Sequence, residues 1–409
     1  MVFTKVKLIC LLFILLSCGA IDTGNSQQTV SRELRLVSMD EIQTGAGQTR
    51  LYFPLLQGKT LGICCNHTAL VNGRHLIDTL VDAGFRVKKI FSPEHGFRGE
   101  AADGDLIKDG IDPSTGTLII SLYGNKKKPE PVDLQGIDLM VFDIQDVGAR
   151  FYTYLSTLAL VMEACAEQDI PMLVLDRPNP NGFYIDGPVL DTVLRSFVGL
   201  HPVPVVYGMT IGEYALMVNG EGWLAGGIQC DLQVIPLSGW DRRMIVRLPV
   251  RPSPNLPTWQ SVYLYPSLCL FEGTVVSVGR GTEYPFQVIG HPDMKTGSYV
   301  FTPERIRGVS ENPPLKGKTC YGQNLTGVAE NFSANEYHFA LKYLIGYFES
   351  LSLHDRFFNN YFEKLAGVKD LRTEILNGTP EEEIRSSWQK GLDDFQVVRK
   401  KYLIYPDFD

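Results

Sequence analysis

The 409-residue sequence predicts an α/β protein with a Rossmann-like parallel sheet, helices on both faces of the sheet, and a smaller C-terminal α/β domain. Three observations predict this fold class. Apolar runs of strand length recur in the first half of the chain, and helix-period segments separate several of them. Short polar stretches follow these runs directly, as they do where ligands bind at the carboxyl ends of parallel strands. From about residue 290 onward, helix-period runs become prominent.

The predicted strands and helices alternate as right-handed parallel crossovers require. Helix periodicity is present over 75–83 and 154–168. Thr210 followed by Glu213 is a capping-box pattern, so we expect a helix to begin there. The prolines of 248–257 favour extended backbone and predict a rigid loop. The expected strands are 60–65, 86–91, 117–121, 138–144 and 171–176, and later helical runs are 335–351 and 355–365.

The N-terminus has the pattern of an export signal. Lys5 and Lys7 precede the apolar run 8–16, which is too short to span a bilayer as a mature helix. The run ends in a Leu-Leu-Ser-Cys-Gly sequence that resembles a bacterial lipobox, which makes Cys18 a candidate lipid anchor. An ordinary signal peptide cut near Ala20 is the alternative. We therefore expect an exported bacterial lipoprotein, periplasmic or on the cell surface, that touches the membrane through this anchor only.

These features predict four segments. They are a lipoprotein signal peptide at 1–18, a polar tether at 19–45, a Rossmann-like catalytic domain at 46–285, and a smaller C-terminal α/β domain at 286–409. The tether is rich in Ser, Thr and Gln, as suits a flexible linker.

Charge and cysteine content exclude several function classes. A net charge of −8 leaves no basic footprint for nucleic acid. The cysteines beyond the signal lack the paired spacing of a zinc site, and His67 and His95 lack His-x-x-Glu or His-x-His spacing. No G-x-G-x-x-G follows the first strand, so a dinucleotide is not supported. We expect no cofactor and no metal, and no protein partner is evident.

Glu94 is the first candidate for chemistry. It follows Pro93 in a stiff turn at a strand end, with His95 and Arg98 in the same turn. A fixed carboxyl in a partly apolar pocket has a raised pKa and can act as a general acid. A solvated loop carboxylate is the alternative, but so many functional side chains in one turn favour a catalytic role.

A second strand-end loop combines carboxylates with aromatic residues. Asp143 and Asp146 precede Arg150 and Tyr152, a combination that suits sugar binding because aromatic faces stack on sugar rings. A helix N-terminus capped by Asp146 explains the same residues equally well.

Two further polar clusters follow later strand ends. Asp176 and Arg177 precede Asn179; the first two can form an ion pair that holds the loop, which leaves Asn179 freer to bind a ligand. Glu272, Arg280 and Glu283 lie in a glycine-rich stretch that permits close backbone approach to a ligand. No Gly-Lys-Ser/Thr follows, so a P-loop is not supported.

Ordered motifs extend from about residue 50 to Tyr405. They include Asn66-His-Thr-Ala-Leu70, Ser92-Pro-Glu-His-Gly-Phe-Arg-Gly99, Asp146-Val-Gly-Ala-Arg-Phe-Tyr-Thr-Tyr154, Asp176-Arg-Pro-Asn-Pro180, Tyr207-Gly-Met-Thr-Ile-Gly-Glu213, Pro252-Ser-Pro-Asn255, Phe271-Glu-Gly-Thr274 and Gly279-Arg-Gly-Thr282. Together these motifs are similar to the exo-β-N-acetylmuramidase family.

The resemblance implies release of N-acetylmuramic acid from the non-reducing ends of peptidoglycan fragments, in a cleft between a Rossmann-like domain and a smaller domain. It implies that Glu94 is the catalytic residue. A glycosidase normally needs a second carboxylate, for which Glu272, Glu283 and Asp143 are the ordered candidates, unless the substrate's own acetamido group attacks. The candidate substrate-binding residues are Asn66, His67, His95, Arg98, Arg150, Tyr152, Asp176, Arg177, Asn179, Asn255 and Arg280.

We expect one of the candidate arginines to bind the lactyl carboxylate of muramic acid, because a guanidinium binds a carboxylate bidentately. Two other function classes stay open. One is a non-catalytic, lipid-anchored protein that binds cell-wall glycan. The other is an amidase or esterase acting on cell-wall material, for which Cys65 near His67 is the available pair.

Overall fold

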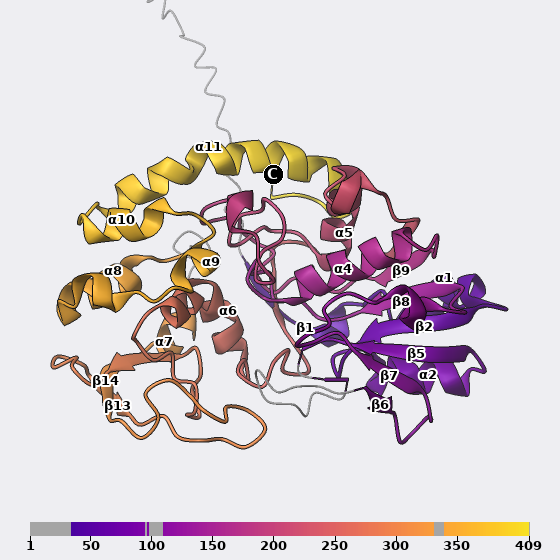
Figure 1. Ribbon diagram of the computed structural model, residues 1–409, viewed down its shortest axis with the longest axis horizontal. Coiled ribbons are helices and arrows are strands. Elements are labelled where there is room, and N and C mark those ends of the chain that lie inside the picture. The colour runs from indigo at the N-terminus through magenta and orange to yellow at the C-terminus, as the bar shows by residue number, and fades with distance from the viewer. Residues whose placement is uncertain (1–33, 95, 98–108, 331–338, 409) are drawn as a thin grey trace, which may run out of the picture. The chain divides into compact units, whose positions relative to one another are not determined.

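The computed structural model describes residues 34–94, 96–97, 109–330 and 339–408 (Figure 1). Its main sheet has seven strands in the order β10-β9-β8-β2-β5-β7-β6, and all neighbours are parallel except β6 and β7. The strands are β2 (Thr60–Cys65), β5 (Arg86–Ser92), β6 (Gly110–Ile111), β7 (Leu118–Ser121), β8 (Leu139–Asp143), β9 (Met172–Leu175) and β10 (Leu232–Ile235).

The chain order of this sheet is that of a Rossmann fold. From β2 the chain moves outward through β5 to β7, then crosses to β8 and moves outward the other way through β9 to β10. The topological switch point therefore lies between β2 and β8, and the crevice at the carboxyl ends of these two strands is where such sheets bind ligands.

Helices cover both faces of the sheet because successive side chains of a strand point to opposite faces. On β8, Met140 and Phe142 pack in one core with α4 (Tyr154–Ala166) and α5 (Ile211–Gly220). Leu139 and Val141 pack in the other core with α1 (Thr49–Leu56) and α2 (Leu76–Asp82). The predicted fold class is confirmed, including the strands from 60 to 176 and the two early helices.

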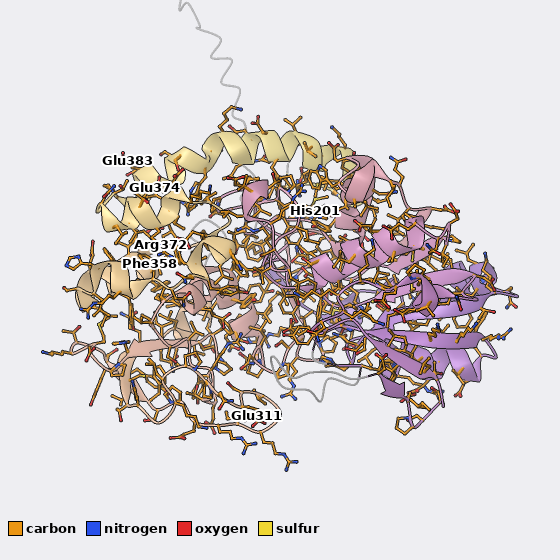
Figure 2. All side chains as sticks on the ribbon, in the orientation of Figure 1. His201, Glu311, Phe358, Arg372, Glu374 and Glu383 are labelled. Carbon is orange, nitrogen blue, oxygen red and sulfur yellow. The ribbon has the colours of Figure 1, made fainter. Side chains whose placement is uncertain are left out.

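The C-terminal part has its own antiparallel sheet, in the order β12-β14-β13, and most of the later helices. Its elements are β12 (Val288–His291), β13 (Tyr299–Phe301), β14 (Cys320–Asn324), α6 (Trp259–Leu268), α7 (Thr326–Glu330), α8 (Lys342–Leu351), α9 (Phe362–Ala366), α10 (Asp370–Leu376) and α11 (Glu381–Arg399). Arg372 on α10 bonds Glu363 on α9, and its guanidinium lies 5.3 Å from the Phe358 ring centroid (Figure 2).

The remaining strands and the remaining α-helix of the described chain are short. They are the parallel pair β1 (Arg35–Ser38) and β11 (Met244–Arg247), the hairpin β3 (Leu70–Val71) and β4 (Arg74–His75), and the short helix α3 (Pro131–Leu134). No helix in the described ranges is long and apolar enough to cross a membrane.

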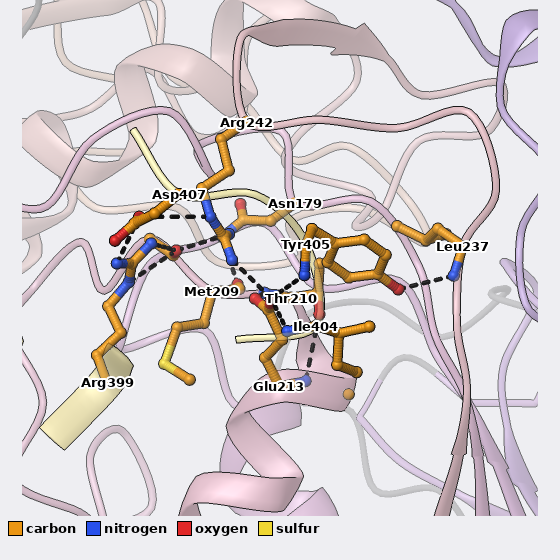
Figure 3. A network of polar contacts seen from close by, with 12 residues as sticks. Asn179, Met209, Thr210, Glu213, Leu237, Arg242, Arg399, Ile404, Tyr405 and Asp407 are labelled. Atoms are coloured by element: carbon orange, nitrogen blue, oxygen red, sulfur yellow. Dashed lines mark hydrogen bonds and ion pairs between the residues drawn. The ribbon is translucent and has the colours of Figure 1, made fainter. Parts of the chain in front are cut away.

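Thr210 begins α5 as expected, and the reciprocal capping box with Glu213 is present. Glu213 also accepts hydrogen bonds from Arg242 at 2.6 Å and from the backbone N–H groups of Ile404 and Tyr405 (Figure 3). The C-terminal tail is thus held against the Rossmann-like part by a buried carboxylate.

Candidate active site

The loops that leave β2 and β8 meet at the switch point. The backbone N–H of Gln145 donates to Oγ1 of Thr68 at 3.0 Å. Oδ1 of Asn66 accepts from both the N–H and the hydroxyl of Thr68, at 2.9 and 2.6 Å. These bonds fix the edge of the sheet beside which a cavity opens.

This cavity has a volume of about 420 Å³, within the range of ligand-binding sites. Its walls come from the ends of Rossmann strands and from the C-terminal part. Besides Glu94 and Glu272, the lining includes Tyr123, Phe151, Tyr152, Thr153, Tyr154, Asn255, Tyr265, Cys269, Phe271, Arg280, Phe286 and Tyr361. Many of these are aromatic, as suits a site that stacks on sugar rings.

Glu94 lies two residues beyond the end of β5 and is half-buried. Its Oε2 accepts a hydrogen bond of 2.8 Å from Oγ1 of Thr153, and its carbonyl oxygen accepts one of 3.4 Å from the Tyr154 hydroxyl. Both donors lie at the N-terminus of α4. The Glu94 carboxyl is therefore held by a helix that packs on the sheet.

Hydrogen bonds also hold the two tyrosines near Glu94, Tyr152 and Tyr154, in place. Nδ2 of Asn66 donates to the Tyr154 hydroxyl at 2.9 Å, and the Tyr152 hydroxyl donates to the Pro252 carbonyl at 2.7 Å. The two tyrosine rings meet edge to face, with centroids 4.8 Å apart. Asn66 thus supports the wall of the cavity, whereas Tyr152 is part of its surface.

Glu272 contributes a second carboxylate to the same cavity. It lies in a 3₁₀ turn, Cys269–Gly273, that directly follows α6. Its Oε1 accepts from Nε of Arg280 at 2.5 Å, and its Oε2 accepts from the Cys269 thiol at 3.6 Å. The guanidinium of Arg280 also lies 5.1 Å from the ring centroid of Phe286, so the ion pair rests on the aromatic wall.

The family is decided by comparison with known proteins. The N-terminal model of exo-beta-N-acetylmuramidase NamZ matches residues 61–260, and its C-terminal model matches 263–405. Peptidoglycan beta-N-acetylmuramidase NamZ of Bacillus subtilis (strain 168) is 40% identical over 392 residues, which are 89% of this chain and 92% of that protein. The chain belongs to the NamZ exo-β-N-acetylmuramidase family.

Solved structures agree with this assignment. A crystal structure of a DUF1343 family protein from Bacteroides fragilis has 47% identity and a TM-score of 0.82, covering 90% of this chain and 99% of that one. A second DUF1343 family protein from the same species has 29% identity and a TM-score of 0.76 with the same coverage. The likeness in fold to these structures thus covers 90% of the chain.

The other two predicted carboxylates of this NamZ family member lie away from the cavity lining. Asp143 is fully buried and forms an ion pair with Arg177, with Nε–Oδ1 and Nη2–Oδ2 distances of 2.5 and 2.9 Å. Glu283 is exposed. The geometry therefore brings together Glu94 and Glu272, the first and second of the predicted catalytic residues.

Arg150, a candidate for ligand binding, is buried and bonds main-chain carbonyls instead. Its Nη1 donates to Pro188 and Val203 at 2.8 and 3.0 Å, and its Nη2 donates to Leu365 and Ala366 at 2.9 and 2.7 Å. These four carbonyls come from both parts of the chain. Arg150 therefore joins the Rossmann-like part to α9.

The cluster after β9 is also used internally. Asp176 accepts from the Tyr405 hydroxyl at 2.6 Å and from Thr210 Oγ1 at 2.8 Å, and burial raises its pKa to about 6. Nδ2 of Asn179 donates to the Met209 carbonyl at 2.7 Å, and its Oδ1 accepts from the N–H of Asn181 at 2.8 Å (Figure 3). Their side chains hold the loops behind the cavity.

Asp146 does not cap α4, because Thr153 is the N-cap residue of that helix. Its carboxylate accepts from the Gly148 N–H at 2.6 Å and from the Tyr207 hydroxyl. Burial outweighs these bonds and raises the pKa of Asp146 to about 7. The alternative interpretation of this loop, a cap by Asp146, is therefore wrong, although the Asp146 carboxylate itself makes only internal bonds.

The remaining candidates divide as follows. Asn255 lines the cavity, and its Nδ2 donates to the Val309 carbonyl at 3.2 Å. Nε2 of His67 lies 2.8 Å from the Arg251 carbonyl oxygen, and burial lowers the pKa of this imidazole. His95, Arg98 and Cys18 lie outside the described residues.

Sequence reasoning missed Thr153 and the aromatic lining from Tyr265 to Phe286. Thr153 directly follows Tyr152, a predicted substrate-binding residue. Its position just before a helix is the sequence signal that indicates it. Tyr265 lies in α6, which begins at Trp259 with a Thr258–Ser261 capping box directly after the proline-rich stretch. That helix brings Tyr265 to the cavity, and the turn that follows it brings Cys269 there.

Proposed function

We propose that this protein cleaves N-acetylmuramic acid from the non-reducing ends of peptidoglycan fragments, acting on the β-1,4 bond between that sugar and N-acetylglucosamine. Such a reaction serves turnover and recycling of the cell wall. Membership of the exo-β-N-acetylmuramidase family supports this, as does the name of the Bacillus subtilis relative.

The observation that carries the proposal is the presence of two carboxyl groups in one cavity with aromatic walls. Glu94 comes from the end of β5, and Glu272 comes from the turn after α6. Glycoside hydrolysis typically needs two carboxyl groups that flank the scissile bond. A cavity of about 420 Å³ with tyrosine and phenylalanine side chains provides the stacking surface for a sugar ring.

In this mechanism Glu94 donates a proton to the glycosidic oxygen as the bond to N-acetylglucosamine breaks. Thr153 orients the carboxyl through its 2.8 Å hydrogen bond. Glu272 acts on the opposite side of the sugar, either as nucleophile or as the base that activates water. The anomer of the first released muramic acid, followed by NMR, distinguishes these two roles.

Recognition of the lactyl carboxylate falls to Arg280. Three of the arginines predicted to bind substrate lie among the described residues. Arg150 and Arg177 are buried and bond other protein groups, whereas Arg280 lines the cavity. A guanidinium has five N–H donors, so it can bond Glu272 and a substrate carboxylate together. This would let the site distinguish muramic acid from N-acetylglucosamine.

The place of action is part of the same proposal. The basic and apolar N-terminus, followed by the lipobox-like sequence at Cys18, supports export and lipid attachment. Incorporation of labelled fatty acid into the full chain, lost in Cys18→Ala, tests the anchor.

The decisive experiment incubates the chain from residue 19 onward with the disaccharide of muramic acid β-linked to N-acetylglucosamine. Glu94→Gln and the disaccharide chitobiose are the controls. We expect free muramic acid from the unaltered protein, a fall in rate of at least about 100-fold for Glu94→Gln, and no cleavage of chitobiose. Saturable binding without cleavage would overturn the enzymatic proposal and favour a glycan-binding protein.

A further inference from the structure

A second hollow in the C-terminal part is lined by residues of α8 and of the strand β14, both of which are labelled in Figure 1. Its volume is about 320 Å³, and it shares no described residue with the cavity around Glu94 and Glu272. We call it the α8 groove. Its lining residues are Met294, Thr296, Gly297, Gly322, Gln323, Lys342, Tyr343, Gly346, Tyr347 and Ser350.

Glycines create this hollow, but for different reasons. A Cβ on Gly297 would lie 2.2 Å from the backbone nitrogen of Gly322, so those two glycines permit close packing of backbone on backbone. A Cβ on Gly346 would meet no heavy atom within 4 Å. Glycine inside a helix is destabilising relative to alanine, and here no packing contact requires it. What Gly346 supplies is open space along one side of α8.

The side chains around that space suit a sugar with an acidic group. Tyr343 is half-buried and presents a ring, while Gln323 and Thr296 are exposed and offer an amide and a hydroxyl. Lys342 is the only charged residue among the described lining residues, and its Nζ lies 5.2 Å from the Tyr343 ring centroid. In a chain of net charge −8, a hollow whose described lining carries an ammonium group and no carboxylate favours an anion.

We propose that the α8 groove is a second, non-catalytic binding site for a glycan chain that carries carboxylates. The proposal rests on the proposed function, in which the substrate is a glycan chain that contains muramic acid. The non-reducing end of that chain then enters the catalytic cavity. The aromatic ring and amide would hold a sugar ring, and Lys342 would bind its carboxylate. The groove would retain a long chain while its end is cleaved elsewhere.

The test compares two tryptophan substitutions, one at the half-buried Gly346 of α8 and one at the exposed Gln389 of α11. Gly346→Trp fills the groove, and Gln389→Trp on α11 is the matched control, because Gln389 is exposed and does not line the groove. Both are made with Glu94→Gln, so that chains stay intact, and affinity for purified peptide-free peptidoglycan glycan chains is measured by calorimetry. We expect about tenfold weaker binding for Gly346→Trp and no change for Gln389→Trp.

The chemistry of the ligand is tested with Lys342→Gln. We expect this change to weaken binding of muramic-acid-containing chains and to leave the weaker binding of uncharged chitin chains unchanged. With Glu94 intact, Gly346→Trp should hydrolyse the disaccharide at the normal rate, because the short substrate does not reach the groove. Should Gly346→Trp fail to fold, Lys342→Gln and Tyr343→Ala carry the test.

Equal affinity of Gly346→Trp and Gln389→Trp for glycan chains would overturn the proposal. So would equal loss of chitin and peptidoglycan binding in Lys342→Gln, because the carboxylate would then have no role. Failure of the proposed function has a different signature, since the unaltered protein would then leave the disaccharide uncleaved whatever the groove variants bind.

Discussion

Oγ1 of Thr153 donates a 2.8 Å hydrogen bond to Oε2 of Glu94 across a sequence separation of 59 residues. The bond joins the end of β5 to the start of α4, two elements that pack in the same core. Pro93 fixes its own φ, so the chain leaves the end of β5 toward Glu94 in a restricted direction. The hydroxyl fixes the remaining freedom of the carboxyl group.

Replacing Thr153 by valine should lower kcat and leave KM nearly unchanged. Hydrogen bonds to charged groups contribute roughly 1.5–3 kcal/mol, which corresponds to a fall of about 10- to 100-fold. Thr153→Ser keeps the hydroxyl and should restore most of the rate. Steady-state kinetics on the muramic acid disaccharide measure both variants. A Thr153→Val enzyme as fast as the unaltered protein would show that the bond has no positioning role.

Glu272→Gln should reduce kcat by at least about 100-fold, because it removes the second carboxylate from the cavity. Glu283→Gln is the matched control, since Glu283 is close in sequence but exposed outside the cavity lining. Its rate should be unchanged. Comparable rates for the two variants would indicate that the acetamido group of the substrate replaces the enzyme carboxylate.

Asp143→Ala should mainly destabilise the fold. The change leaves the Arg177 guanidinium buried without its anion, which typically costs about 3–5 kcal/mol in the free energy of unfolding. Urea denaturation measures this loss. The double variant Asp143→Ala with Arg177→Met removes both charges and should recover part of it. A stable Asp143→Ala protein without hydrolytic activity would instead place Asp143 in the reaction.

Asp146 should make stability depend on pH. Burial raises its folded-state pKa from 3.8 to about 7, so the folded protein binds this proton more tightly than the unfolded chain. The free energy of unfolding therefore falls as pH rises from about 4 to about 7. Asp146→Asn does not titrate, so its stability relative to the unaltered protein should improve across this window. Denaturation curves give the free energy of unfolding of both proteins at pH 4.5 and at pH 7.5. The same difference between the two proteins at both pH values would contradict this.

Strand ends could be predicted from the sequence because apolar runs are local signals. β2 occupies the expected 60–65, and Glu94 lies just after a strand end, as expected, in the lining of a cavity. The sequence around each carboxylate does not show which of them lines the same cavity as Glu94. Asp143 and Glu272 each have an arginine partner, and tertiary packing alone buries one pair in the core and leaves the other on the cavity wall.

The long helix α11 was missed although its signal was present. Ile384, Trp388, Leu392 and Phe395 recur at helical spacing and are buried, but charged residues outnumber them along the helix. The arginines were equally hard to assign, because a buried guanidinium that bonds carbonyls, as Arg150 does, has no distinctive sequence pattern.

The C-terminal tail has a consequence for the order in which the protein is made. Glu213 and Asp176 belong to the Rossmann-like part, yet Ile404 and Tyr405 supply several of the donors that satisfy them. A ribosome releases those donors long after it has released Glu213 and Asp176. The polar core of the Rossmann-like part therefore stays incomplete during synthesis until the segment around Tyr405 has emerged.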